Sequence, residues 1–352
     1  MIEKKTTAVR QKFVLAMSGG VDSSAAALLL RDVGDCLGVT LTMFPGADPS
    51  SAIDARRVCD TLGLPHATWD ASAVFRRYVT DYFADAYASG RTPNPCVVCN
   101  RHVKFGFLLD RAIEDGYDTV ATGHYARIWK DGGRVLVRKA ADARKDQSYV
   151  LAMLTAEQLR HVAFPLGELS KAEIRAMAEE AGLITAHKSD SQDICFIPDG
   201  DYDAFLTRYT GEAAIPGDFL AADGTKLGTH RGQRRYTIGQ SRGLGIALGC
   251  RMYVTAKDAA ANTVTIDADE GRVYRTRVTC RSWNNQTGER LPDGMTCAAK
   301  LRYAHHESPC RVWESENGGL VLEFATPQRA PTPGQFAVLY DGDIVLGGGE
   351  IV

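Results

Sequence analysis

The residues Ser18-Gly19-Gly20-Val21-Asp22-Ser23-Ser24 decide the fold of the N-terminal half of this chain. The apolar run at residues 13–17 precedes them and is typical of a buried strand, while the Ala- and Leu-rich run at residues 23–30 predicts a helix. Two glycines let the backbone turn tightly beside an anion, and the free amides of the helix start face that anion. The sequence therefore predicts a phosphate-binding strand–turn–helix unit.

The alternation of strands and helices continues outward from this unit. We expect strands at residues 36–41, 66–69 and 119–122, and helices at residues 51–62, 73–88, 105–114 and 170–181. Such alternation predicts a doubly wound α/β domain with a parallel sheet and helices on both faces. A hairpin is expected around residues 131–133, because paired apolar runs flank a turn signal there.

The helical signal fades from about residue 203, and short alternating runs separated by Gly and Pro replace it. This pattern predicts an all-β remainder made of a small domain and a barrel. We therefore divide the chain into an α/β domain that carries the phosphate loop at 1–203, a small linking domain at 204–272 and a C-terminal β-barrel at 273–352.

Composition indicates the protein's class and compartment. The chain has 352 residues, of which 45% are hydrophobic and 24% charged, and no run approaches the roughly 18 apolar residues of a membrane span. The polar start lacks the apolar core of a signal peptide, so we expect a cytoplasmic protein with no membrane partner. The net charge of −2 means that any RNA binding must rest on local basic clusters, which occur at residues 138–145 and 231–235.

Nine cysteines, an odd number scattered along the chain, argue against a secreted disulfide framework. Cys96 and Cys99 form a C-x-x-C pair in what the sequence indicates is a turn between helices, a setting in which a disulfide forms readily. Cys195 follows the polar run 189–193, and taken alone it is equally a reactive thiol or a buried core cysteine. The remaining six are expected to be buried: Cys36, Cys59, Cys250, Cys280, Cys297 and Cys310.

The phosphate loop lacks the Gly-Lys-Ser/Thr ending of a Walker loop and is similar to the S-G-G-x-D-S motif of PP-loop ATP pyrophosphatases. Further motifs occur in the order typical of one branch of that superfamily, and the sequence resembles the tRNA-specific 2-thiouridylases over almost its whole length. The matching segments are residues 94–100, 121–125, 146–149, 190–196, 236–240, 302–303, 332–335 and 346–349.

The resemblance implies an adenine nucleotide alpha hydrolase-like catalytic domain and a tRNA sulfurtransferase. ATP would adenylate the C2 oxygen of the wobble uridine, Cys195 would carry sulfur as a persulfide, and Cys99 would act as nucleophile or resolving thiol, giving 2-thiouridine, AMP and pyrophosphate. Asp22 would position Mg²⁺ or a helix-turn amide. The implied ATP-binding residues are Ala16, Met17, Ser18, Gly19, Gly20, Val21, Asp22, Ser23, Leu41 and Gly123.

The resemblance also implies the partners. These are the anticodon region of tRNA and a sulfur donor such as a cysteine desulfurase or a relay protein. The implied tRNA-binding residues are Asn94, Pro95, Cys96, His124, Lys145, Asp146, Gln147, Arg302, Tyr303 and Gln335. Ser241 stands where relatives usually carry Arg, so no tRNA contact is assigned to that side chain.

Two questions stay open at the level of sequence. Many family members carry Asp at position 96, and the cysteine here offers Cys96, Cys99 and Cys195 as ligands of a 4Fe–4S cluster, an alternative to the persulfide route. A zinc site is disfavoured because no fourth ligand has suitable spacing. The alternative functions are another PP-loop enzyme, such as an argininosuccinate or GMP synthetase-like ligase, and a non-catalytic RNA-binding relative.

Overall fold

The computed structural model describes residues 10–46, 49–189 and 194–352. It separates into two compact units. The first unit comprises residues 1–76 and 99–192, and the second comprises residues 77–98 and 193–352. No helix among the described residues is long and apolar enough to cross a membrane.

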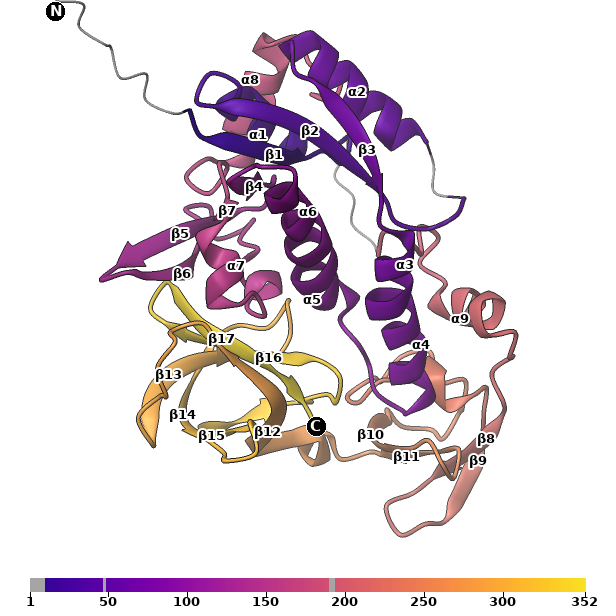
Figure 1. The fold of residues 1–352 in the computed structure, drawn as a ribbon. Helices are drawn as coiled ribbons and strands as arrows, with labels where there is room; N and C mark the ends of the chain where they lie inside the picture. The colour runs from indigo at the N-terminus through magenta and orange to yellow at the C-terminus, as the bar shows by residue number, and fades with distance from the viewer. Residues whose placement is uncertain (1–9, 47–48, 190–193) are drawn as a thin grey trace, which may run out of the picture. The chain divides into compact units, whose positions relative to one another are not determined.

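A five-stranded parallel sheet forms the centre of the first unit, in the order β3-β2-β1-β4-β7 (Figure 1). Its strands are β1 (Lys12–Ala16), β2 (Asp35–Thr42), β3 (His66–Asp70), β4 (Thr119–Ala121) and β7 (Val162–Ala163). Residues of β1 such as Phe13 and Leu15 are almost completely buried, as expected for a central parallel strand covered on both faces. The predicted parallel α/β domain is confirmed.

Three helices of this unit pack together beside the sheet: α1 (Val21–Leu30), α2 (Ser50–Leu62) and α8 (Lys171–Glu180). Helix α1 is buried along most of its length because α2 and α8 both cover it. Helix α2 ends at Gly63 in the left-handed conformation, and Ser170 caps α8 in a reciprocal pair with Glu173, as the sequence predicts. The predicted hairpin is formed by β5 (Ala126–Asp131) and β6 (Arg134–Lys139).

The segment that carries Cys96 and Cys99 differs from expectation. Helix α5 (Pro95–Cys99) runs directly into a π-helical stretch, η2 (Asn100–Phe107), and then into α6 (Leu108–Glu114). Pro95 occupies the first helical position, where its missing N–H costs nothing, and Asn94 Oδ1 accepts a hydrogen bond from the Val97 amide at 3.4 Å. The prediction that the cysteine pair lies in a turn is therefore wrong, because the Asn-Pro signal starts a helix.

The expected helix at 73–88 consists of α3 (Ser72–Phe75), a π-helical stretch η1 (Arg76–Thr80) and α4 (Asp81–Ala88). Short elements complete the first unit: η3 (Ser148–Leu151) and α7 (Ala156–Arg160).

The second unit contains a helix that the sequence did not predict, because the helical periodicity fades from about residue 203. Helix α9 (Tyr202–Thr210) starts where Asp201 Oδ1 accepts the Ala204 amide at 2.9 Å and ends at Gly211 with φ +76°. A four-stranded sheet follows in the order β10-β11-β8-β9, with Phe219 and Val254 fully buried in its core. Its strands are β8 (Gly217–Leu220), β9 (Lys226–His230), β10 (Tyr253–Asp258) and β11 (Thr263–Asp267). The 3₁₀ turns η4 (Gln233–Arg235) and η5 (Glu270–Val273) flank β10 and β11 in sequence.

Six antiparallel strands close into the predicted C-terminal barrel. Strand β12 pairs with both β15 and β17, so this part of the sheet has no free edge. Buried and exposed residues alternate along β14 and β15, and the inward side chains, among them Val312 and Leu322, fill the barrel. The strands are β12 (Tyr274–Asn285), β13 (Met295–Lys300), β14 (Ser308–Glu314), β15 (Leu320–Arg329), β16 (Phe336–Asp341) and β17 (Ile344–Ile351).

Candidate active site

The phosphate loop is a tight turn between β1 and α1. Gly19 has φ +69°, and a Cβ there would lie 2.3 Å from the Ser51 carbonyl oxygen, so no other residue fits this position. The Ser23 hydroxyl bonds to the Gly20 carbonyl at 3.0 Å and accepts the Ser18 amide at 3.2 Å. These bonds hold the turn in the shape that presents a helix N-terminus to an anion.

Asp22, in the first turn of α1, has two partners from distant segments. Its Oδ1 accepts hydrogen bonds from the Lys171 Nζ and from the Tyr125 hydroxyl, each at 2.7 Å. The Lys171 side chain is only 13% exposed, so this ion pair is partly shielded from water. Sequence reasoning missed both partners. The available signal was a lysine at the first position of a helix, where the helix dipole disfavours a cation.

A second lysine holds the opposite side of the loop. Lys188 Nζ donates to the Gly19 carbonyl and to Asp54 Oδ2, each at 2.9 Å, and Thr185 donates to the Ser24 hydroxyl at 2.9 Å. Sequence reasoning did not identify this contact. The segment after α8 thereby anchors the phosphate loop in the first unit.

Two further predicted nucleotide residues lie at the carboxyl ends of β4 and β2, the strands on either side of β1. Gly123 follows β4 and lies against α1, because a Cβ there would be 2.7 Å from the Asp22 carbonyl carbon. Leu41 is half-buried near the end of β2, the strand paired with β1. Ligand crevices of parallel sheets occur at this edge. The structure therefore gathers the predicted ATP-binding residues at one edge of the sheet.

The segment after Gly123 is buried. His124 is 8% exposed, bonds to the Thr122 hydroxyl at 2.7 Å and has the rings of Phe105 and Phe164 about it. Burial holds the pKa of His124 well below its usual value, which keeps the ring neutral. As placed, the side chain stabilises the strand end and offers RNA little surface.

The predicted tRNA-binding residues Asp146 and Gln147 are engaged within the first unit. Asp146 accepts the Ser148 hydroxyl at 2.7 Å and the Ala140 amide at 2.9 Å. Gln147 Oε1 accepts the Tyr125 amide at 2.9 Å. Gln147 thus positions the residue whose hydroxyl bonds to Asp22. Their contact with tRNA stays a prediction.

Cys195 lies on the surface of the second unit. It occupies a turn closed by a 2.8 Å bond from the Ile197 amide to the Ile194 carbonyl, and its side chain is exposed. The next residue, Phe196, is buried 5.4 Å from the Phe83 ring and 5.0 Å from the Phe205 ring. A core role for Cys195 is therefore excluded, and Phe196 fixes the turn that presents it. Residues 190–193 before it lie outside the described residues.

The other cysteines divide by burial. Cys99 is 8% exposed and Cys96 is exposed. Burial raises the pKa of the Cys36 and Cys59 thiols to about 11 and that of Cys280 to about 12, so these thiols are poor nucleophiles. Cys297 and Cys310 are buried too, as predicted. Cys250 is exposed, and the expectation that it is buried is wrong because it lies in a surface loop beside Met252.

The barrel holds the segment that leads into Cys96. Gln335 Nε2 donates to the Thr92 carbonyl at 2.8 Å, and the Thr92 amide donates to the Pro333 carbonyl at 2.8 Å. Arg91 Nη1 meets Glu350 Oε1 of β17 at 2.5 Å. All of these residues belong to the second unit. Predicted as a tRNA contact, Gln335 is placed here as a support for the cysteine-bearing segment.

Comparisons with known proteins agree with this arrangement. The model of the tRNA methyl transferase HUP domain matches residues 11–199, that of the PRC-barrel domain matches residues 203–268, and that of the aminomethyltransferase beta-barrel domain matches residues 275–351. The tRNA-specific 2-thiouridylase MnmA of Lachnoclostridium phytofermentans is 44% identical, covering 97% of this chain and 99% of that protein. The Roseiflexus sp. protein of the same name is 45% identical with the same coverage of both chains. The chain belongs to the tRNA-specific 2-thiouridylase family.

The solved structures that match have a lower sequence identity to this chain than the thiouridylases have. A 4-thiouridine synthetase in complex with RNA and ATP is 19% identical, has a TM-score of 0.36 and matches over 54% of this chain and 46% of that one. An NMN synthetase from Francisella tularensis is 13% identical, with a TM-score of 0.34 over 59% of this chain and 79% of that one.

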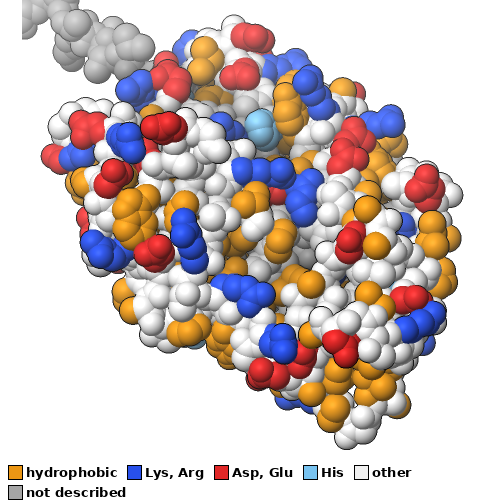
Figure 2. Space-filling view, turned by 90° about the horizontal axis from the view of Figure 1, so that it is seen from below, with side chains coloured by type: hydrophobic (Ala, Val, Ile, Leu, Met, Phe, Trp, Pro, Cys, Tyr) orange, Lys and Arg blue, Asp and Glu red, His pale blue; other side chains and the backbone are white. Residues whose placement is uncertain are grey.

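The other predicted tRNA contacts of this thiouridylase-family chain differ in exposure. Tyr303 is 45% exposed, and Lys300 Nζ lies over its ring, 5.8 Å from the ring centre. Arg302 instead donates to the Ala330 carbonyl at 3.0 Å and to the Thr332 hydroxyl, which joins segments of the second unit. On the face drawn in Figure 2, Lys and Arg side chains are interspersed with Asp and Glu, which agrees with the net charge of −2.

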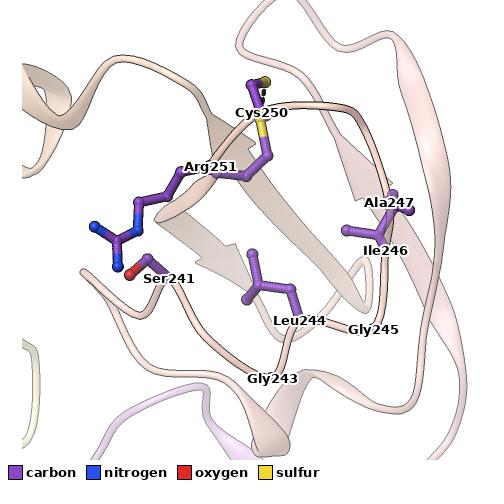
Figure 3. A pocket seen from close by; sticks show the side chains of 9 residues that line it. Ser241, Gly243, Leu244, Gly245, Ile246, Ala247, Cys250 and Arg251 are labelled. Atoms are coloured by element: carbon purple, nitrogen blue, oxygen red, sulfur yellow. Dashed lines mark hydrogen bonds between the residues drawn. The ribbon is translucent and has the colours of Figure 1, made fainter.

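A loop of the linking domain lines an open pocket of about 370 Å³ (Figure 3). Arg251 lines it together with Ser241, so the loop carries a guanidinium although residue 241 lacks one. The Cys250 and Met252 sulfur atoms lie 3.6 Å apart. Nothing else in this pocket points to a ligand.

Metal ligands are not preassembled in the part of the chain that the structure describes. Among those residues, no three His, Cys, Asp or Glu side chains are grouped to hold a metal ion. A 4Fe–4S cluster held by Cys96, Cys99 and Cys195 stays a prediction.

Proposed function

We propose that this protein catalyses ATP-dependent 2-thiolation of the wobble uridine of tRNA. The observation that carries the proposal is an ordered phosphate loop in a chain that also presents Cys195 on an exposed turn. The relatives named tRNA-specific 2-thiouridylase support it over nearly their full length. A ligase of the same superfamily needs the loop but not the thiols.

In the first step, ATP binds at the carboxyl edge of the parallel sheet, with its phosphates on the phosphate loop at residues 18–24. The C2 oxygen of uracil attacks the α-phosphate, pyrophosphate leaves, and the base carries AMP on its oxygen. Asp22 would hold Mg²⁺ on the phosphates, a role suited to a carboxylate. Lys171 and Lys188 supply positive charge beside the same loop.

In the second step, sulfur replaces the activated oxygen. The terminal sulfur of a Cys195 persulfide adds to C2, and AMP departs with the former O2. The Cys99 thiolate then attacks the Cys195 sulfur, which breaks the S–S bond, leaves 2-thiouridine and forms a Cys99–Cys195 disulfide. A cellular thiol reduces this disulfide, and the sulfur donor reloads Cys195. A thiolate is the competent nucleophile for both sulfur steps.

The partners follow from this chemistry. The substrate is the anticodon region of a tRNA, and the proposed contacts that need no rearrangement are Asn94, Pro95, Cys96, Lys145 and Tyr303. The other proposed contacts would first have to leave the partners that they hold in this structure: His124, Asp146, Gln147, Arg302 and Gln335. The sulfur donor is a cysteine desulfurase or a relay protein. Because the thiols must be regenerated, we place the enzyme in the reducing cytoplasm.

The family model that matches residues 11–199 is described as a tRNA methyl transferase domain, and methyl transfer is a different reaction from sulfur transfer. Two features favour sulfur transfer here: the S-G-G-x-D-S loop suits the phosphates of ATP, and Cys195 is exposed. Methyl transfer would need neither a phosphate loop nor the cysteine pair. The mass of the modified nucleoside separates the two reactions directly.

The decisive experiment incubates the purified protein with ATP, a persulfide donor and unmodified tRNA. We expect AMP, pyrophosphate and 2-thiouridine, identified by chromatography and nucleoside mass spectrometry. Release of AMP and pyrophosphate without any modified base would favour a ligase-like enzyme, and tRNA binding without ATP cleavage would favour the non-catalytic alternative. Asp22→Asn is the matched control, because it keeps the side-chain size and removes the charge from the loop.

A further inference from the structure

A cavity lies inside the second unit, between the linking domain and the barrel. Its volume is about 340 Å³, and it is formed by β10, β12 and the turn before β16. This volume lies within the range of small-molecule pockets and far above the space of one water molecule. The cavity contains none of the phosphate-loop or cysteine residues described above.

The charged side chains that line this cavity are all basic. They are Lys257 from β10 and Arg275 and Arg277 from β12, and the lining side chains include no Asp or Glu. Pro331, Pro333 and Ile351 contribute an apolar wall. The cavity is therefore complementary to an anion that also carries an apolar or sugar-like part.

Lys257 is an unusual feature of the cavity. Its Nζ is buried and has no hydrogen-bond partner among the described residues. Burial lowers the pKa of Lys257 to about 8. A buried ammonium without a partner is strongly disfavoured, so retaining one at a cavity wall indicates that a ligand completes it.

We propose that this cavity binds a phosphate group, with Arg275 and Arg277 contacting it from the rim and Lys257, whose Nζ is covered by the cavity wall in this structure, turning to pair with it. Guanidinium groups match the geometry of phosphate, and a lysine adds a point charge. The phosphate belongs either to the backbone of RNA or to a free phosphate compound. The RNA source rests on the proposed function, whereas the free source does not.

The cavity adjoins the segment that supports Cys96. Gly90 and Pro333 both line it, and the Pro333 carbonyl accepts the Thr92 amide. A phosphate bound here would touch the same turn that holds residues 91–93. A ligand in the cavity would therefore contact the turn at Pro333 that holds the segment leading to Cys96.

The test compares the full-length protein with Lys257→Met, which keeps most of the side chain and removes the charge. Lys226→Met is the matched control, because Lys226 lies on β9 of the same sheet in an exposed ion pair with Asp218. Inorganic phosphate and ribose 5-phosphate are titrated by calorimetry, and unmodified tRNA is titrated by filter binding over a range of salt concentrations. Arg277→Gln, at an exposed site, serves as a second variant if Lys257→Met does not fold.

For a free phosphate compound, we expect a binding event in the wild type and the Lys226→Met control that Lys257→Met lacks. For RNA, we expect Lys257→Met to bind tRNA about tenfold more weakly, with the slope of log K against log salt reduced by about one. Either result supports the site and identifies the source. Phosphate and tRNA binding by Lys257→Met and Arg277→Gln equal to that of Lys226→Met overturns the proposal.

A thermal measurement separates this proposal from the proposed function. In phosphate-free buffer, Lys257→Met should melt above the wild type, because it removes an unpaired buried charge. If the free-phosphate source is correct, added phosphate should raise the melting temperature of the wild type but not that of the variant. Neither result depends on thiolation activity.

Discussion

Lys171 at the first position of α8 donates a 2.7 Å hydrogen bond to Asp22 in the phosphate loop, 149 residues earlier in the chain. Tyr125 bonds to the same carboxylate oxygen. The ion pair fixes the direction of the Asp22 carboxylate and brings a positive charge to the anion-binding turn. If Asp22 binds Mg²⁺ during turnover, Lys171 is freed to contact the phosphates. Lys171 is thus a positioning residue in the resting structure.

We predict that Lys171→Met slows pyrophosphate release by roughly 10²- to 10³-fold, the range for removing one electrostatic stabiliser. Pyrophosphate release in the presence of tRNA measures the effect. Lys171→Arg should recover part of the rate. If Lys171 acts on the reaction, kcat and KM for ATP should change by different factors. If its role is purely structural, the unfolding temperature should change instead. Lys226→Met is the control, and a wild-type rate in Lys171→Met would contradict the assignment.

We predict that Cys195→Ser and Cys99→Ser each abolish 2-thiouridine formation while pyrophosphate release continues. The reason is that adenylation needs the phosphate loop, whereas sulfur transfer needs the thiols. Cys250→Ser is the matched control, because Cys250 is also exposed but lies outside the cysteine motifs. Nucleoside mass spectrometry and pyrophosphate assays on the same samples separate the two steps. If the Cys195→Ser protein thiolates tRNA at the wild-type rate, the proposed role of Cys195 is wrong.

The elements that could be predicted are those whose structure follows from a short stretch of sequence. The phosphate loop, the capping box at Ser170 and the alternating strands of the barrel were all recognisable, because glycine conformation, capping and side-chain period are local properties. The cysteine-bearing helix was not predicted, because Asn94-Pro95 suits either a turn or a helix start. Helix α9 was missed because its apolar face is short.

Candidate site residues were predictable where a motif carries them and not where a tertiary contact does. Lys171 and Lys188 are ordinary surface-type residues in the sequence, and only the fold brings them to Asp22 and Gly19. Conversely, the sequence cannot reveal that the Gln335 and Arg302 side chains bond to backbone carbonyls of the second unit. The presence of a functional group is visible in the sequence, but its partner depends on long-range packing.

We predict that Glu350→Gln destabilises the protein by roughly 2 kcal/mol, the cost of breaking hydrogen bonds to a charged group. The Glu350 side chain is 10% exposed and pairs with both Arg91 and Arg281, so its loss leaves two guanidinium groups without a counter-charge. Urea unfolding measures the effect. Because Arg91 precedes the Cys96 segment, thiolation should fall more than pyrophosphate release. Equal stability of variant and wild type would show that the pair is not stabilising.

The role of Cys96 decides between the two sulfur routes. It is exposed on α5, three residues before the buried Cys99, and many relatives carry Asp at this position. If sulfur travels through persulfides, Cys96 is dispensable, because the two bonds that form and break involve only Cys99 and Cys195. If a 4Fe–4S cluster with three protein ligands is required, losing one thiolate removes a ligand that has no replacement.

We therefore predict that Cys96→Asp, purified without oxygen, contains no stoichiometric iron and still thiolates tRNA with a persulfide donor at close to the wild-type rate. Iron and sulfide analysis with EPR spectroscopy on both proteins gives the metal content, and nucleoside mass spectrometry gives the activity. Cys96→Ala is the paired control, because it removes the thiol without adding the carboxylate common in relatives. A cluster in the wild type whose loss in both variants abolishes thiolation would replace the persulfide route with cluster-bound sulfide.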